Sequence, residues 1–261
     1  MPSASGGADA TSDDPGGEME DSRDPNLTKF LATCGAASRR RADELIRSGR
    51  VTVDGAVTTD PAFRVASSRV VALDGKTVAP PDKFRYVMLN KPRGYVCSNS
   101  DAHAEHLALE LITGFPGCFL RSAGRLDKES EGLIVFSDDG DYLERVAHPR
   151  HRVTKIYDVT VSHPLTGKVL AAMRTGIVDG GELLRVLEAQ QISPGRLRIK
   201  LNEGKKREIR RLCAHLGAPV VALRRIALGG LTLGDLKPGA YRELSEREVA
   251  LSLTPDPAAE I

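Results

Sequence analysis

The feature that most constrains the fold is a change of pattern at Pro80-Pro81. Before it, "NLTKFLATCGAASRRRADELIRSGRVTVDG" (26–55) carries two helical stripes of apolar residues, each ended by a glycine. Ser38 is a typical N-cap for the second helix. Strand-like alternation follows, with Asp-Gly turns between the runs. The pattern predicts a compact unit of two helices and short strands at residues 26–80.

A second pattern begins at residue 84 and runs to residue 252. We expect strands at 84–90, 132–137, 153–162, 183–192 and 195–202, and helices at 104–112, 141–147, 166–174 and 206–216. Because the strands are not separated by helices in regular alternation, the sheet should be mixed or antiparallel. The fold class is therefore α+β, and a short flexible tail at 253–261 should follow.

The charge of the chain is unevenly distributed. The net charge is +2, but residues 1–25 hold seven acids and one arginine, so the remainder carries +8. An acidic leader rich in Gly, Ser and Asp is typical of a disordered extension, and a mildly basic body is typical of a protein that binds a polyanion. The alternative is that the leader, 1–25, is a solvated extension without a function. Aromatic residues make up 4% of the chain and tryptophan is absent, which disfavours a module that stacks several bases on its sheet.

Several classes of protein are disfavoured by what the sequence lacks. The four cysteines are scattered, which fits a reducing compartment and not the common zinc spacings. No apolar run approaches the length of a membrane span, and the N-terminus carries no basic-then-apolar signal. The glycine-rich loops that bind nucleotide cofactors are also missing. We therefore expect a soluble cytoplasmic protein with no cofactor, no bound metal and no membrane partner.

Basic residues gather at the second predicted helix of the small unit and in the turn after it. They are Arg39, Arg40, Arg41, Arg47 and Arg50. Positive side chains beside the free N–H groups of a helix start form a suitable surface for phosphate. The alternative is an ordinary solvated helix face, and the spacing alone does not distinguish the two.

An isolated carboxylate lies in "SAGRLDKESEGLIVFSDDG" (122–140). Asp127 stands between Arg125 and Lys128 and precedes an apolar run typical of a strand. It either caps the turn before that strand or serves as an ionised carboxylate held among cations. Glu129 and Glu131 are nearby, but acids in an exposed turn are usually solvated. Only Asp127 is a strong candidate, which argues against a hydrolase that uses paired carboxylates.

Several stretches together resemble known RNA-binding and RNA-modifying proteins. Residues 26–75, with "ASRRRADELIRSGRVTVDG" at their centre, resemble the S-four (alpha-L) RNA-binding domain. The stretch "GRLDKESEGLIVFSDDG", together with "NKPRGYVCS" (90–98), "KIYDV" (155–159) and "NEGKKREIRRLCAHLG" (202–217), resembles the RsuA family of ribosomal RNA pseudouridine synthases. The family order is kept, and these stretches span nearly all of 84–252. The resemblance implies a small RNA-binding domain followed by a pseudouridine synthase domain.

The resemblance also implies roles for individual residues. Asp127 matches the catalytic aspartate, and Tyr157 matches the tyrosine that packs on the target uracil and is a candidate for handling its carbon-5 proton. Lys205 matches the basic partner of the aspartate, with Lys206 as the alternative one place along. The substrate-binding set adds two pocket positions, Arg125 near the displaced base and Ile209 in the lining.

The implied reaction detaches uracil from its ribose, rotates it and rejoins it through carbon-5. It needs no cofactor or metal, and the aspartate can act covalently or by stabilising charge. We expect a monomer that acts on ribosomal RNA, free or in pre-ribosomal particles. The compact two-domain form with "NKPRGYVCS" favours the large-subunit (RluB-like) branch. The alternatives are a small-subunit enzyme and a non-catalytic RNA-binding or ribosome-assembly protein.

Overall fold

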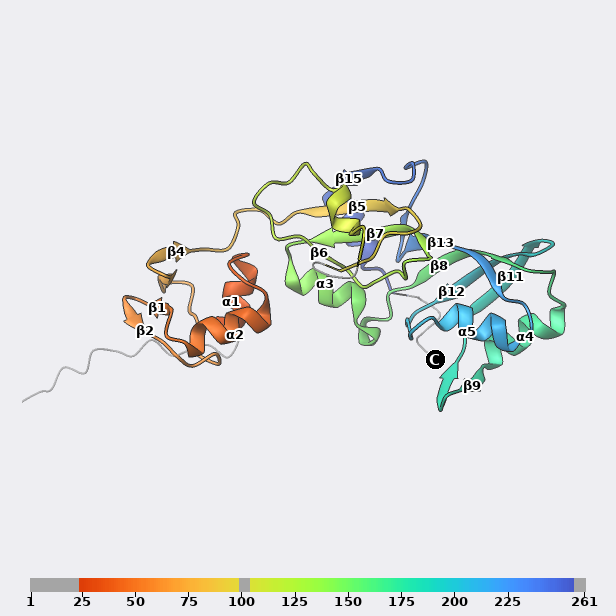
Figure 1. The fold of residues 1–261 in the computed structure, drawn as a ribbon, viewed down its shortest axis with the longest axis horizontal. Helices are drawn as coiled ribbons and strands as arrows, with labels where there is room; N and C mark the ends of the chain where they lie inside the picture. The colour runs from red at the N-terminus through yellow and green to blue at the C-terminus, as the bar shows by residue number, and fades with distance from the viewer. Residues whose placement is uncertain (1–23, 99–103, 256–261) are drawn as a thin grey trace, which may run out of the picture. The chain divides into compact units, whose positions relative to one another are not determined.

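The computed structural model describes residues 24–98 and 104–255, and the chain divides into two compact units, Met1–Pro80 and Pro81–Ile261 (Figure 1). The predicted acidic leader therefore lies outside the described residues, apart from its last two positions. The predicted tail lies outside them from residue 256 onward.

The small unit joins two helices and a four-stranded antiparallel sheet in one core. Its elements are α1 (Leu27–Thr33), α2 (Arg39–Arg47), β1 (Val51–Val53), β2 (Ala56–Val57), β3 (Val71–Leu73) and β4 (Lys76–Val78), in strand order β2-β1-β3-β4. Asn26 and Ser38 cap the helices, because their side-chain oxygens accept hydrogen bonds from the backbone N–H groups of Lys29 (2.8 Å) and Arg41 (3.3 Å). The shared core contains Leu27, Leu31, Ala42, Leu45, Ile46, Val51, Val53, Val65 and Val71.

The two Asp-Gly turns of this unit fix the strand register. Asp54 and Gly55 have φ of 50° and 83°, and Asp74 and Gly75 have φ of 50° and 76°. Positive φ at both central residues belongs to the tight hairpin turn that Asp-Gly favours. These turns are therefore confirmed where the sequence predicts them.

The large unit is built on a nine-stranded mixed sheet. The main strand order is β11-β12-β8-β13-β7-β5-β15, with β14 added beside β13 and β6 beside β7. Their bounds are β5 (Tyr86–Lys91), β6 (Arg121–Ser122), β7 (Glu131–Ser137), β8 (Lys155–Val161), β11 (Glu188–Ser193), β12 (Arg196–Leu201), β13 (Val220–Leu228), β14 (Leu231–Thr232) and β15 (Tyr241–Glu243). Among the named strands of the described residues, only β13 and β7 pair in parallel, and an isolated parallel bridge joins Val96 and Leu107. The predicted α+β class with a mixed sheet is confirmed.

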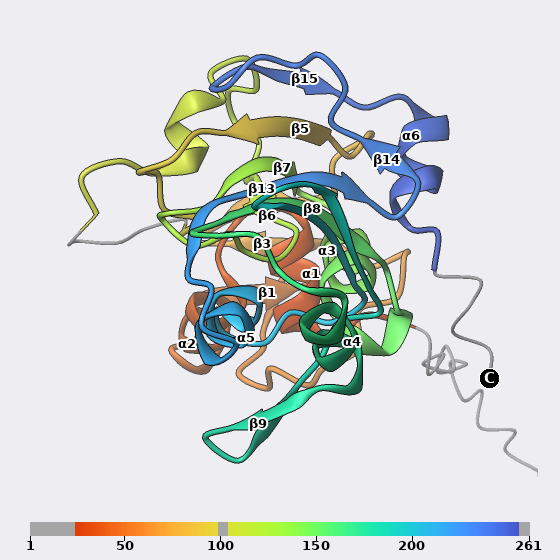
Figure 2. The ribbon, with the colours of Figure 1, turned by 90° about the vertical axis from the view of Figure 1, so that its right-hand side faces the viewer.

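The helices of the large unit pack on two separate cores. These helices are α3 (Gly140–Ala147), α4 (Gly167–Thr175), α5 (Glu208–His215) and α6 (Glu246–Ser252), with short 3-10 helices η1 (Ala108–Leu111) and η2 (Pro149–His151). The larger core unites α4 and α5 with β8 and β12, and the smaller one unites α3 with β7 and β14. Strands β9 (Ile177–Asp179) and β10 (Glu182–Leu184) form a separate hairpin, which projects beyond α4 and α5 in Figure 2.

Four differences from the expected elements concern the central sheet and the elements around the site, and the short strands β6, β9, β14 and β15 and the helix α6 were not expected either. The expected strand 183–192 is two strands, β10 and β11, separated by residues 185–187. The expected helix 206–216 begins only at Glu208, because Arg207 has a left-handed backbone with φ of 53°. Of the expected helix 104–112, only the turn η1 forms among the described residues. Strand β13 is not predicted at all, although it lies in the middle of the sheet.

Candidate active site

A pocket in the large unit gathers residues from distant parts of the sequence. It is lined by Arg125, Leu126, Asp127, Ser130, Tyr157, Leu201, Gly204, Lys205, Arg207, Glu208, Ile209 and Leu223. The turn between β6 and β7 supplies one side, β8, β12 and β13 supply apolar side chains, and the start of α5 supplies the other side. The predicted site residues of this unit therefore converge here, with the exception of Lys206.

Asp127 lies in the turn between β6 and β7, where the backbone is tightly held. Its carbonyl accepts a hydrogen bond from the N–H of Ser130 (2.9 Å), and the carbonyl of Lys128 accepts one from the N–H of Gly94 (2.8 Å). The Asp127 side chain remains 35% exposed. The carboxylate thus faces the pocket from a fixed turn and is still reachable by a ligand.

The basic partner of Asp127 is Arg210, a residue that the sequence interpretation missed. The Arg210 Nε atom lies 3.8 Å from Asp127 Oδ2, and the arginine side chain is only 11% exposed. Its Nη2 atom donates to the carbonyl of Glu129 (3.0 Å) and to Ser130 Oγ (3.2 Å). Nε is buried and has no hydrogen-bond partner among the described residues. Burial lowers the pKa of Arg210, an effect that Arg207 reinforces and Asp127 opposes.

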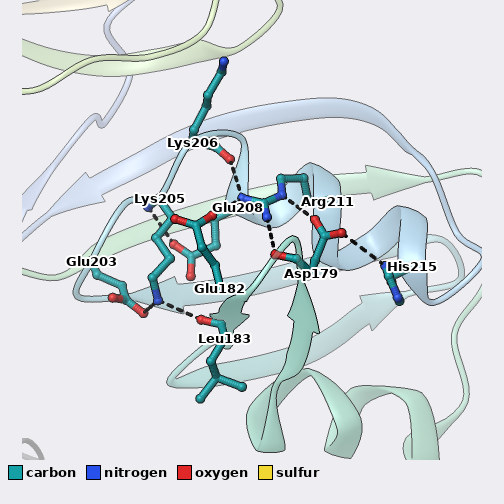
Figure 3. Close-up of polar contacts among 9 residues, drawn as sticks. All are labelled: Asp179, Glu182, Leu183, Glu203, Lys205, Lys206, Glu208, Arg211 and His215. Atoms are coloured by element: carbon teal, nitrogen blue, oxygen red, sulfur yellow. Dashed lines mark hydrogen bonds and ion pairs between the residues drawn. The ribbon is translucent and has the colours of Figure 1, made fainter.

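Lys205 lines the pocket, but its charged end points toward the β9–β10 hairpin (Figure 3). Its Nζ atom donates to the carbonyl of Leu183 (2.7 Å) and forms an ion pair with Glu203 (2.9 Å). In this structure the predicted pairing of Lys205 with Asp127 is therefore not formed. The alternative, Lys206, is not paired with Asp127 either, since its exposed side chain points away from the other residues drawn in Figure 3.

Arg211 fastens α5 to the same hairpin (Figure 3). Its Nε and Nη1 atoms form ion pairs with Asp179 (2.5 Å) and Glu182 (2.6 Å), and Nη2 donates to the Asp179 carbonyl (2.8 Å). Hydrogen bonds to these two acids raise the pKa of Arg211. The consecutive residues Arg210 and Arg211 thus hold α5 from two directions, one toward the turn of Asp127 and the other toward the hairpin.

The floor of the pocket is apolar and carries one aromatic ring. Tyr157, on β8, is 9% exposed and Ile209, on α5, is 4% exposed. Glu208 is also buried, and its Oε2 atom accepts a hydrogen bond from the Lys205 N–H (3.0 Å). Burial raises the pKa of Glu208. A flat ring, an apolar wall and one accessible carboxylate suit a planar, neutral ligand such as a nucleobase.

A second buried cation lies behind the turn of Asp127. Lys91, at the end of β5, is fully buried and donates to the carbonyls of Pro92 (2.9 Å) and Tyr95 (2.8 Å). Burial lowers the pKa of Lys91, and Asp127 is among the acids that oppose this. Arg125 is exposed at the pocket and makes no ion pair with a described residue. The surroundings of Asp127 are therefore mainly positive.

The predicted phosphate surface of the small unit is partly neutralised. Acids of the same unit pair with Arg41 (Glu44, 2.7 Å), Arg47 (Asp43, 2.9 Å) and Arg50 (Asp74, 2.5 Å). Arg39 and Arg40, at the start of α2, are exposed and have no acid partner among the described residues. These two are the arginines of the set that are free to meet phosphate.

Comparisons with known proteins agree with this geometry. The family model for RNA pseudouridylate synthase matches residues 85–215, and the S4 (S-four) domain model matches residues 26–71. The chain belongs to the RNA pseudouridylate synthase family. It is thus an isomerase, and the predicted RsuA-type arrangement with an S-four domain is confirmed.

Relatives of this pseudouridine synthase match along nearly the whole chain. The ribosomal small subunit pseudouridine synthase A of Escherichia coli K12 is 38% identical over 228 residues, which cover 86% of this chain and 98% of that protein. An uncharacterised RNA pseudouridine synthase of Mycobacterium bovis is 38% identical over 244 residues, covering 89% and 95%. A crystal structure of a pseudouridylate synthase superposes with a TM-score of 0.64 at 29% identity, covering 87% and 99%.

The expected large-subunit branch is not supported, because the Escherichia coli relative carries a small-subunit name. In the part of the chain that the structure describes, no helix has both the length and the apolar character needed to cross a membrane.

Proposed function

We propose that this pseudouridine synthase isomerises a specific uridine in small-subunit ribosomal RNA. The observation that carries the proposal is the 38% identity to the Escherichia coli small-subunit enzyme, which extends over 98% of that enzyme. The match therefore includes both the S-four domain and the catalytic domain. We assign RNA docking to residues 26–80, through the free Arg39 and Arg40, and the chemistry to residues 84–252.

The pocket supports a division of roles among its residues. Asp127 provides the carboxylate that acts on the ribose or the base, and Arg210 holds that carboxylate in position through their ion pair. Tyr157 stacks on the uracil ring, and Ile209 closes the apolar side. Arg125, which is exposed at the pocket, contacts the displaced base. A uridine in folded RNA must first leave its stack to reach this pocket, at a cost of a few kcal/mol.

The test is a map of pseudouridines in both ribosomal RNAs from cells with and without the gene. We expect one pseudouridine of small-subunit RNA to disappear in the deletion strain and to return when the wild-type gene is restored. Restoration with an Asp127→Asn variant should leave the site unmodified, since the substitution keeps the volume and removes the charge. Loss of a site in large-subunit RNA instead would overturn the proposed substrate. Full restoration by the variant would remove Asp127 from the mechanism.

A further inference from the structure

Two aromatic rings are stacked beside the active-site turn. The centroids of the Tyr95 and His106 rings lie 5.2 Å apart, with their planes at 30°. The other ring pairs found in the described residues meet at 57° to 78°, which are tilted or edge contacts. The nearly parallel pair therefore has the geometry that continues into a stack when a third flat ring is added.

The backbone holds this pair in place. The N–H of Val96 donates to the carbonyl of His106 (3.0 Å), and the N–H of Ala108 donates to the carbonyl of Val96 (2.9 Å). Tyr95 is half-buried and packs against the larger core, whereas His106 is exposed. The tyrosine thus forms the fixed base of the pair, and the imidazole is the ring that meets solvent.

The pair is tied directly to the turn that carries Asp127. Gly94, the neighbour of Tyr95, donates its N–H to the carbonyl of Lys128 (2.8 Å), and Arg93 forms an ion pair with Glu129 (2.7 Å). Lys128 is exposed and has no ion pair with a described residue. An aromatic pair joined by one backbone hydrogen bond to the turn that carries an exposed lysine and Asp127 has the composition of a site for single-stranded nucleic acid.

We propose that Tyr95 and His106 form a stacking platform for an RNA base adjacent to the target uridine. When the uridine leaves the helix, its neighbour loses a stacking partner, and an aromatic ring held against the turn of Asp127 replaces that partner. Any base can stack on such a platform, because each base has a flat face. The ligand is a nucleotide of the same RNA, so the inference rests on the proposed function and deepens it.

The test combines protein variants with changes in the RNA. The RNA is a small-subunit fragment that the wild-type enzyme converts, made also with an abasic nucleotide at each position next to the target. We expect His106→Ala to raise the Kd for the intact fragment by at least about fivefold, which is the lower end of the effect of losing one stacked base. A loss at this lower end is expected because the Tyr95 ring is still present and retains part of the stacking. The single-turnover rate at saturating RNA should stay within about twofold of wild type. His106→Phe should retain the affinity.

One abasic position should reproduce the loss caused by His106→Ala. With the wild-type enzyme, removing that base should weaken binding, and with His106→Ala the same removal should weaken binding less. His163→Ala, which removes another exposed histidine of the same unit, is the matched control and should bind every RNA as wild type does.

Two outcomes would overturn the platform. One is an His106→Ala variant that binds the intact fragment as tightly as wild type. The other is an abasic penalty of equal size in wild type and variant at every flanking position, which would leave the ring pair with a structural role only. Failure of the proposed function is a separate result, since the wild-type enzyme would then convert no small-subunit fragment at all.

Discussion

Replacing Arg210 by methionine removes the cation nearest to Asp127 and keeps a side chain of similar length. The two charged groups lie 3.8 Å apart. At this distance two unit charges attract by about 4 kcal/mol at an effective dielectric constant near 20 and by about 1 kcal/mol in water. Because Arg210 is 11% exposed and Asp127 is 35% exposed, the interaction lies between these limits. We therefore expect kcat/KM to fall by about 10- to 1,000-fold.

Single-turnover isomerisation of the target RNA, measured together with Tm, provides the test. Arg210→Lys keeps the positive charge but not the guanidinium donors to Glu129 and Ser130. Its loss of activity should therefore be smaller than that of Arg210→Met. Arg196→Met, at an exposed position of β12, is the matched control and should retain wild-type activity. An Arg210→Met enzyme within about threefold of wild type and with an unchanged Tm would refute the assignment. A larger loss in Lys205→Met than in Arg210→Met would restore Lys205 as the partner of Asp127.

Two further predictions concern stability. Gly132→Ala should lower the free energy of unfolding, measured by chemical denaturation, by more than about 3 kcal/mol, because the new Cβ would lie 2.3 Å from the Arg225 carbonyl oxygen at a φ of +103°. Gly117→Ala is the control: its Cβ would meet open space at a φ of +80°, so the loss should be only about 1 kcal/mol. A Gly132→Ala protein as stable as the Gly117→Ala control would contradict the close approach of β7 to β13. Hydrogen bonds from Arg242 and Ser245 lower the pKa of Glu248 from 4.5 to about 2, so its stabilising contribution is complete above pH 4.5 and is lost as the pH falls toward 2. In thermal melts, Glu248→Gln should therefore be less stable than wild type by about 1 kcal/mol in unfolding free energy at pH 7, and this difference should shrink between pH 4.5 and pH 2. A stability difference that does not depend on pH would contradict a contribution from the charged carboxylate.

The elements that the sequence predicts well depend on interactions between near neighbours. Ser38 caps α2 by accepting a hydrogen bond from the N–H three residues along the chain. Each Asp-Gly pair forms a turn between the two strands that directly flank it. The site stretches were located by their resemblance to a family, and five of the predicted site residues line one pocket: Arg125, Asp127, Tyr157, Lys205 and Ile209. A local pattern is sufficient for the caps and turns, because they need no distant partner, whereas the pocket residues come from distant parts of the chain and were found through the family resemblance.

Strand β13 shows where a local pattern fails. Two consecutive arginines, Arg224 and Arg225, interrupt its apolar alternation, and a charged pair ordinarily marks a solvated segment. In the structure Arg225 is only 3% exposed, because its Nε atom donates to the carbonyl of Leu133 on the parallel strand β7 (2.6 Å). The partner that makes this burial tolerable lies 92 positions away in sequence. No window of neighbouring residues contains that information.

The choice of Arg210 over Lys205 follows from the same limitation. The stretch "KKREIRR" offers five basic side chains, and which of them faces Asp127 depends on where α5 begins and how it is rotated. Arg207 has a left-handed backbone conformation with φ of 53°, so the helix starts at Glu208. Each following residue is then rotated by about 100° around the helix axis. Ile209 then faces the pocket, Arg210 the turn of Asp127 and Arg211 the hairpin. Since a single helix carries all three, the ion pairs of Arg211 with Asp179 and Glu182 also help to fix where Arg210 points. The β9–β10 hairpin therefore helps to set the position of Arg210 beside Asp127.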